Sequence, residues 1–156
     1  IYYIIKKRFI LIMGNNTSIN KINFEYIQKC INYGSEKVLL INTMDYSKQD
    51  CLIKNSIHAS KEEEILNNCL KNNRHIKIVI YGENCTDNKV ILKYNQLYKL
   101  GFANLYVYIG GLFEWLLLQD IYGDEEFPTS SKIIDILKYK GTSNTSYVTG
   151  INNYKK

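Results

Sequence analysis

The chain has 156 residues, of which 46% are hydrophobic and 22% charged, and its formal net charge is +5. This length suits one domain with a sizeable core, and this composition excludes wholesale disorder. The positive charge comes almost entirely from lysines interleaved with acidic residues, which argues against the clustered, arginine-rich face of a nucleic-acid-binding protein.

The first 22 residues are predicted to form an extension ahead of the domain. Residues 1–12 are apolar but interrupted by basic residues, and they are too short to span a bilayer. They form either an edge strand or helix on the domain, or a leader upstream of a true start at Met13. In the second case residues 13–18 match the pattern M-G-x-x-x-[ST]. Gly14 is then a candidate for N-myristoylation and reversible, peripheral membrane contact.

Apolar patterns predict alternating helices and strands over residues 23–123. Asn23 can cap a first helix that ends at Gly34. A continuous apolar run at 38–41 is typical of a strand buried on both faces. The remaining elements are an apolar run in a turn-rich region at 52–57, a helix opened by a capping box at Ser60 and running through Leu70, strands at 76–81 and 105–109, and helices at 89–100 and 112–122.

This alternation predicts an α/β fold with a central, mostly parallel sheet flanked by helices on both faces. The composition then changes, so residues 124–156 are assigned to a separate C-terminal region. It is predicted to contain a turn at 124–129, a short helix capped by Ser131 and running through Leu137, and a polar tail from Gly141.

The four cysteines show no motif of a metal site or a dithiol. Cys30, Cys51, Cys69 and Cys85 include no C-x-x-C pair, the spacing of a zinc ribbon or a thioredoxin-type site. No secretory signal indicates an oxidising compartment, so we expect reduced thiols and a cytoplasmic protein. The sequence therefore predicts no metal and no cofactor.

The loop between the strand at 76–81 and the helix at 89–100 is the main candidate site. Ligands of open α/β sheets bind beyond the carboxyl ends of the strands. Backbone N–H groups at the start of the following helix would stabilise an anion there, including a persulfide. Cys85 is the only cysteine of this loop and hence the candidate nucleophile. The candidate substrate-binding residues are its neighbours in the loop, Glu83, Asn84, Thr86, Asp87, Asn88 and Lys89.

Several segments resemble rhodanese-like domains. The closest matches are Leu-Gly-Phe at 100–102 leading into the strand, and Gly-Gly-x-x-x-Trp at 110–115. Weaker matches are the strand end at 40–42, the segment at 52–57 where the family has H-I-P-G-A-I, and the strand at 78–81. The resemblance implies the rhodanese-like fold over residues 23–123. It also implies sulfur transfer through a persulfide on Cys85, from a small sulfur-containing anion to a thiol acceptor.

The chain departs from the family at positions used for catalysis. Counted from the strand end, the nucleophile would be Gly82, whereas counting back from Gly101 places it near Cys85, because this loop is longer. Further departures are Asn42 for an aspartate, Met44 for an arginine and Leu52 for a histidine. Phosphatase chemistry is excluded, since it needs an arginine six residues after the cysteine and that position is Ile91.

Two functions therefore remain open: a sulfurtransferase that uses Cys85, or a catalytically inactive binding or scaffold module with a protein partner. Glu83 and Asp87 flank Cys85 and would repel an anionic sulfur donor. In an enzyme, the Cys85 sulfur should lie where the N–H groups of the loop converge. In a binding module, Cys85 should point aside and Glu83 or Asp87 should fill the site.

Overall fold

Helices and strands alternate along the chain, as predicted. The computed structural model describes residues 18–34 and 36–142, so the predictions for residues 1–12, Met13, Gly14 and the tail after residue 142 lie outside the described part. The elements are β1 (Lys21–Ile22), α2 (Phe24–Tyr33), β2 (Val38–Asn42), η1 (Tyr46–Lys48), β3 (Ser56–Ile57), α3 (Ala59–Asn72), β4 (Lys77–Tyr81), α4 (Lys89–Lys99), β5 (Leu105–Tyr108), α5 (Gly111–Tyr122) and η2 (Ile136–Tyr139).

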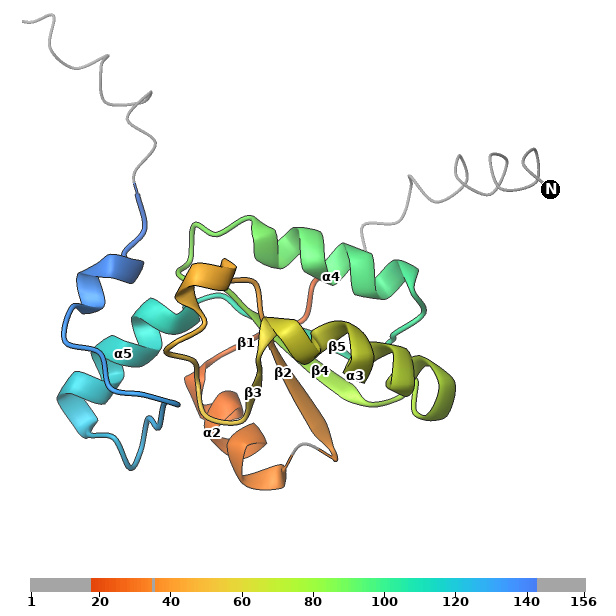
Figure 1. Cartoon of the computed structure of the whole chain (residues 1–156), viewed down its shortest axis with the longest axis horizontal. Helices are drawn as coiled ribbons and strands as arrows, with labels where there is room; N and C mark the ends of the chain where they lie inside the picture. Colours follow the sequence, from red (N-terminus) through yellow and green to blue (C-terminus); the bar gives the residue numbers. More distant parts are fainter. Residues whose placement is uncertain (1–17, 35, 143–156) are drawn as a thin grey trace, which may run out of the picture.

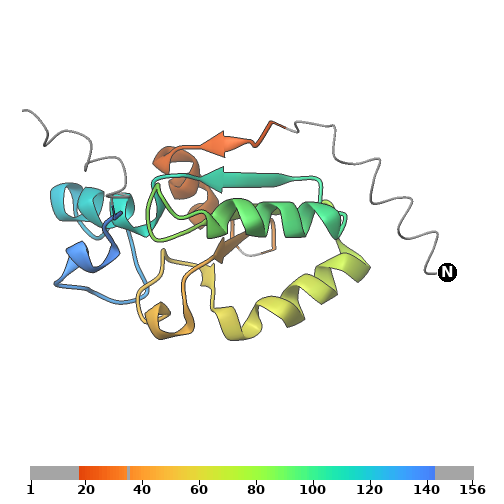
Figure 2. The same ribbon diagram turned by 90° about the horizontal axis from the view of Figure 1, so that it is seen from above.

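The strands form one five-stranded sheet in the order β1-β5-β4-β2-β3. Every pairing between these strands is parallel, which confirms the predicted sheet. Figure 1 shows α4 and α2 on opposite sides of the strands, and Figure 2 shows β1 beside β5 at the edge. The sequence did not predict β1, because a strand of two residues is too short to show an alternating pattern.

The central strands are buried on both faces and divide the core in two. In β2, Leu39 and Ile41 contact the cluster that includes α3 and α4, whereas Val38 and Leu40 contact the cluster with α2 and α5. Successive side chains of a strand point to opposite faces, so a continuous apolar run supplies both clusters.

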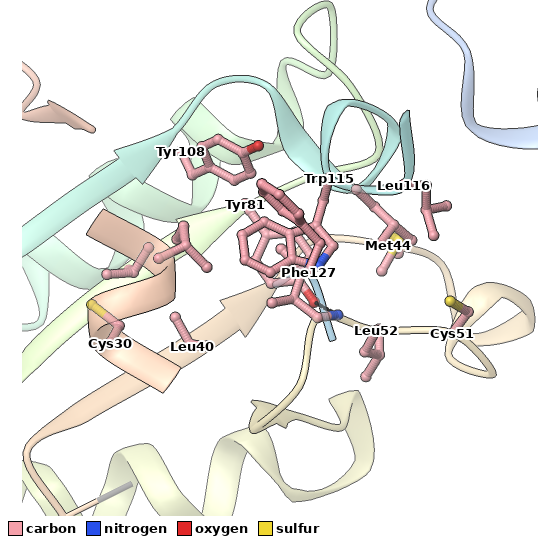
Figure 3. Close-up of a cluster of buried hydrophobic side chains, with 14 of the residues drawn as sticks. Cys30, Leu40, Met44, Cys51, Leu52, Tyr81, Tyr108, Trp115, Leu116 and Phe127 are labelled. Atoms are coloured by element: carbon pink, nitrogen blue, oxygen red, sulfur yellow. Dashed lines mark hydrogen bonds between the residues drawn. The ribbon is translucent and has the colours of Figure 1, made fainter. Parts of the chain in front are cut away.

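Aromatic side chains fill the core between the sheet and α5 (Figure 3). Trp115 is fully buried, with its ring centroid 6.4 Å from that of Tyr108 and 4.9 Å from that of Phe127. Its indole nitrogen donates to the Pro128 carbonyl at 3.3 Å. Residues beyond α5 therefore belong to the same core as the sheet.

Two predicted helix starts are wrong. Helix α3 begins at Ala59, because His58 is the N-cap and its Nδ1 accepts from the backbone N–H of Ser60. The C-terminal helix does not begin at Ser131, whose hydroxyl donates to the Asp50 carbonyl at 2.7 Å. That bond holds Ser131 against the segment after η1, and only the short η2 forms further on.

No helix within residues 18–34 and 36–142 is long and apolar enough to cross a membrane. The cysteines at positions 30, 51, 69 and 85 are all free thiols, and the first three are buried.

Candidate functional site

The predicted site loop, residues 82–88, connects β4 to α4 at the carboxyl edge of the sheet. The first turn of α5 holds it in place: the N–H of Leu112 donates to the Gly82 carbonyl at 2.9 Å and that of Phe113 to the Glu83 carbonyl at 2.8 Å. The two segments can approach this closely because of Gly111, whose φ is +66° and where a Cβ would lie 2.7 Å from the Gly82 oxygen. The Gly-Gly turn thus approaches the loop closely, and it does so through Gly111.

The carboxylate of Asp87 lies inside the loop. Its Oδ2 accepts from the backbone N–H of Glu83 at 3.3 Å and from the Thr43 hydroxyl at 3.2 Å. Its Oδ1 accepts from the N–H of Lys89 at 2.9 Å, at the first residue of α4. Asp87 is thus the bound anion of the loop, placed where the helix N-terminus favours negative charge.

Asp87 also lies against the residue that directly follows β4. A Cβ built on Gly82 would overlap the Asp87 carboxylate, with the carboxyl carbon 2.9 Å away, and would lie 2.7 Å from Cγ2 of Val90. A cysteine at position 82, where the strand-end count places the family's nucleophile, has no room unless Asp87 moves.

The Cys85 thiol lies outside the hydrogen bonds of the Asp87 carboxylate. It is exposed, and within residues 18–34 and 36–142 its sulfur has no hydrogen-bond partner. Neither of the N–H groups bound by Asp87 points to it, since they are already donated to the carboxylate. The loop therefore brings together Glu83, Asp87 and Lys89 through the Asp87 carboxylate, and it leaves the Cys85 thiol outside this arrangement.

All but one of the other predicted binding residues of the loop have structural partners. Glu83 forms an ion pair of 2.7 Å with Lys48 of η1, and both side chains are largely buried. Lys89 forms an ion pair of 2.8 Å with Asp45, and the hydrogen bond from Lys89 lowers the pKa of the Asp45 carboxyl. Thr86 donates its N–H and hydroxyl to the side-chain oxygen of Asn84, while Asn88 is exposed and its side chain makes no capping bond.

Asn42, where the family has an aspartate, is buried in a network of neutral amides. Its Nδ2 donates to the Ile57 carbonyl at 2.9 Å and to Gln49 Oε1 at 3.2 Å. Its Oδ1 accepts from Gln49 Nε2 at 2.7 Å and from the N–H of Met44 at 3.2 Å. Gln49 was not predicted, because nothing in the local pattern shows that its side chain reaches back to β2.

An ionised carboxylate at position 42 could not donate the two hydrogen bonds that Asn42 Nδ2 donates in this network. We expect Asn42→Asp to lower the free energy of unfolding by roughly 2–3 kcal/mol, because the ionised carboxylate would face two acceptor oxygens. Urea unfolding at neutral pH measures the effect. Asn68→Asp adds the same charge at an exposed position of α3 and should change stability by less than about 0.5 kcal/mol. Equal losses in the two variants would contradict this account of the network.

Met44 and Leu52, which replace the family's arginine and histidine, are core residues. They are 5% and 4% exposed and lie in the cluster of Trp115 (Figure 3). In the same cluster Tyr81 is completely buried, and burial raises the pKa of its hydroxyl. That hydroxyl is satisfied by the N–H of Ile53 at 3.2 Å and by Ser56 Oγ at 2.7 Å. The positions at which the family has an arginine and a histidine therefore hold apolar core side chains here.

A cleft of about 480 Å³ opens at the same edge of the sheet, between α3 and α4. An ion pair of 2.6 Å between Lys93 and Glu62 bridges the two helices that form its walls. Tyr46 and Leu92 line it and are each 69% exposed. The cleft thus offers apolar and charged groups together, whereas the loop offers an anion site that is already filled.

Comparisons with known proteins agree with the fold. The family model of the rhodanese-like domain matches residues 26–118. The solution structure of the rhodanese-like domain of the Alr3790 protein from Anabaena sp. is 21% identical, with a TM-score of 0.51, covering 80% of this chain and 87% of that one. The BH2092 protein from Bacillus halodurans is 15% identical, with a TM-score of 0.52 and coverage of 76% and 80%. No curated protein matches.

Proposed function

Because the chain belongs to the rhodanese-like domain family, we propose that it is a non-catalytic member that binds a protein partner. The observation that carries the proposal is the Asp87 carboxylate, which accepts hydrogen bonds from Glu83, Lys89 and Thr43 inside the loop. Sulfur transfer needs these donors for an external anion and for the persulfide it forms. Here an internal carboxylate has taken them.

The residues around the loop support the same proposal. Gly82 supplies no nucleophile at the end of β4, and Asp87 leaves no room for one. The nearest cations, Lys48 and Lys89, are each paired with a carboxylate. An incoming thiosulfate would therefore meet the Glu83 and Asp87 carboxylates, and Lys48 and Lys89 are already paired.

The cleft between α3 and α4 is the surface we propose for the partner. A bound partner would bury the exposed apolar surface of Tyr46 and Leu92, which line the cleft. The ion pair of Lys93 with Glu62 supplies polar groups beside them. Mixed lining of this kind is typical of protein-binding surfaces. The proposal includes a reversible myristoyl anchor on Gly14, supported by the pattern at residues 13–18.

The second candidate function is sulfur transfer through Cys85. The exposure of this thiol, on the loop that carries the nucleophile in the family, favours it. A persulfide there would form with the sulfur in solvent, outside the hydrogen bonds of the loop. The two candidates differ in whether the protein takes up sulfur.

Mass spectrometry of the intact protein after thiosulfate treatment distinguishes the candidates. We expect no gain of a sulfur atom that cyanide can remove, because the donors of the loop are occupied by Asp87. Cys85→Ser and Cys69→Ser are the matched variants, one exposed and one buried. A gain of one sulfur that is lost in Cys85→Ser but kept in Cys69→Ser would replace the proposal by the enzymatic function.

A further inference from the structure

The segment after Ser131 lies against the site loop. We call residues 132–142 the strap; it contains η2 and lies beside α5 in Figure 1. Asn84 of the loop donates its Nδ2 to the Tyr139 carbonyl at 2.9 Å. A Cβ on Gly141 would be 3.1 Å from the Thr86 hydroxyl, so the strap backbone touches the loop there as well. The strap begins beyond residue 118, where the family match ends.

The strap is held by few hydrogen bonds, in contrast to the segment just before it, and only Ile133 and Ile136 besides Tyr139 pack against the core cluster. Residues 127–131 are bonded to the chain near β3: Lys54 N–H donates to the Pro128 carbonyl and Ser130 N–H to that of Leu52. In the strap, the ion pair of Lys138 with Asp50 is 3.8 Å long and exposed, which makes its contribution small. Ile134 is 97% exposed and Leu137 60%.

The main contact of the strap is the ring of Tyr139, and the hydroxyl of this residue is buried without a polar partner among the described residues. The side chain is completely buried, yet its hydroxyl has no hydrogen-bond partner within residues 18–34 and 36–142. Burial, with Asp50, Cys51 and Glu83 nearby, raises the pKa of Tyr139 to about 12. A buried hydroxyl without a partner costs about 1–3 kcal/mol, a cost that is relieved when the side chain reaches water.

From these contacts we infer that the strap is a cover for the site loop. The strap opens as a unit while the sheet stays folded. Asn84 joins the two parts, because its Nδ2 holds the strap and its Oδ1 holds Thr86 of the loop. Closing the strap therefore fixes the Asn84–Thr86 part of the loop, and opening it frees that part. By linkage, any ligand that prefers the free loop must also favour the open strap.

The solvent accessibility of the Cys51 thiol reports whether the strap is open. This thiol is completely buried, donates to the Ser131 carbonyl at 3.3 Å, and lies near the Tyr139 hydroxyl. Departure of Tyr139 would expose it. Cys30 and Cys69 are also buried, but in α2 and α3. Within the described part of the chain, neither forms a hydrogen bond or ion pair with the strap, so their labelling rates report the opening of other parts of the domain and serve as internal controls.

The test is the rate at which iodoacetamide labels each thiol in the full chain carrying Cys85→Ser, at several low urea concentrations. We expect Cys51 to react much faster than Cys30 and Cys69, with a rate that hardly changes with urea, because opening exposes little surface. Asn84→Ala should speed Cys51 labelling by about five- to tenfold. Tyr139→Phe should slow it, and Lys132→Ala, at an exposed strap position, should leave it unchanged.

The inference would be overturned if Cys51, Cys30 and Cys69 reacted at equal rates, with equal urea dependence, in the protein with an unaltered strap. The strap would then open only with global unfolding. This result needs no strap variant, so it holds even if Asn84→Ala fails to fold. The measurement does not involve sulfur uptake, and its outcome is independent of the function proposed above.

Discussion

Replacing Gly111 with alanine is expected to lower the free energy of unfolding by roughly 2–5 kcal/mol. Two effects add. The φ of +66° is unfavourable for a residue with a side chain, and the new Cβ would lie 2.7 Å from the Gly82 oxygen and 2.8 Å from the Asn84 nitrogen. Both of those atoms are backbone atoms of the site loop, so the overlap cannot be relieved by turning a side chain.

Gly101→Ala is the matched control for this variant. Gly101 has a φ of +102°, but nothing lies within 4 Å of the position of a Cβ. Its replacement should therefore cost only the conformational part, about 1–2 kcal/mol. Urea unfolding followed by the fluorescence of Trp115, the single tryptophan, measures both variants. Losses of the same size would mean that the loop adjusts freely and that the contact with α5 does not fix it.

Removal of the Asp87 carboxylate should destabilise the protein and create an anion site. We expect Asp87→Ala to lose roughly 2–3 kcal/mol, because the N–H groups of Glu83 and Lys89 lose a charged acceptor. The same two groups are then free at the N-terminus of α4, where sulfate or thiosulfate can bind. Sulfate should therefore restore part of the lost stability of the variant.

The comparison must separate binding from the general stabilising effect of sulfate on folded proteins. We would measure the melting temperature in sulfate and in chloride at equal ionic strength, for the unaltered protein and for Asp87→Ala. Asp87→Asn, which keeps the shape and loses the charge, should lie between them. If sulfate raises the melting temperatures of all three proteins equally, Asp87 does not occupy an anion site.

The α/β fold was predictable because its signals are local. The runs at 38–41 and 78–81 are continuously apolar, and the helices that follow them have a clear period. The Gly-Gly turn is equally local, and it makes its close approach to the loop at Gly111. These features depend on neighbouring residues, so the sequence displays them directly.

The details of the site were less predictable because they depend on distant residues. Glu83 and Asp87 were both predicted as possible occupants of the loop, but the choice of Asp87 depends on Thr43, 44 positions away. Likewise, Ile53 forms a bridge with Thr129, and Asn84 bonds to Tyr139. Periodicity and capping patterns contain no information about such pairs, which arise only when the sheet brings them together.

The place of β1 in the sheet bears on how this protein is made. Lys21 pairs with Val107, 86 positions later in the chain. At a synthesis rate of roughly 5–20 residues per second, the ribosome needs about 4–17 s to supply the partner strand. Until then the N-terminal segment has no sheet to join, and after β5 emerges its open edge can pair with any extended chain nearby. The nascent domain thus passes through a period in which a chaperone, or a second unfinished copy, competes with its own N-terminus for that edge.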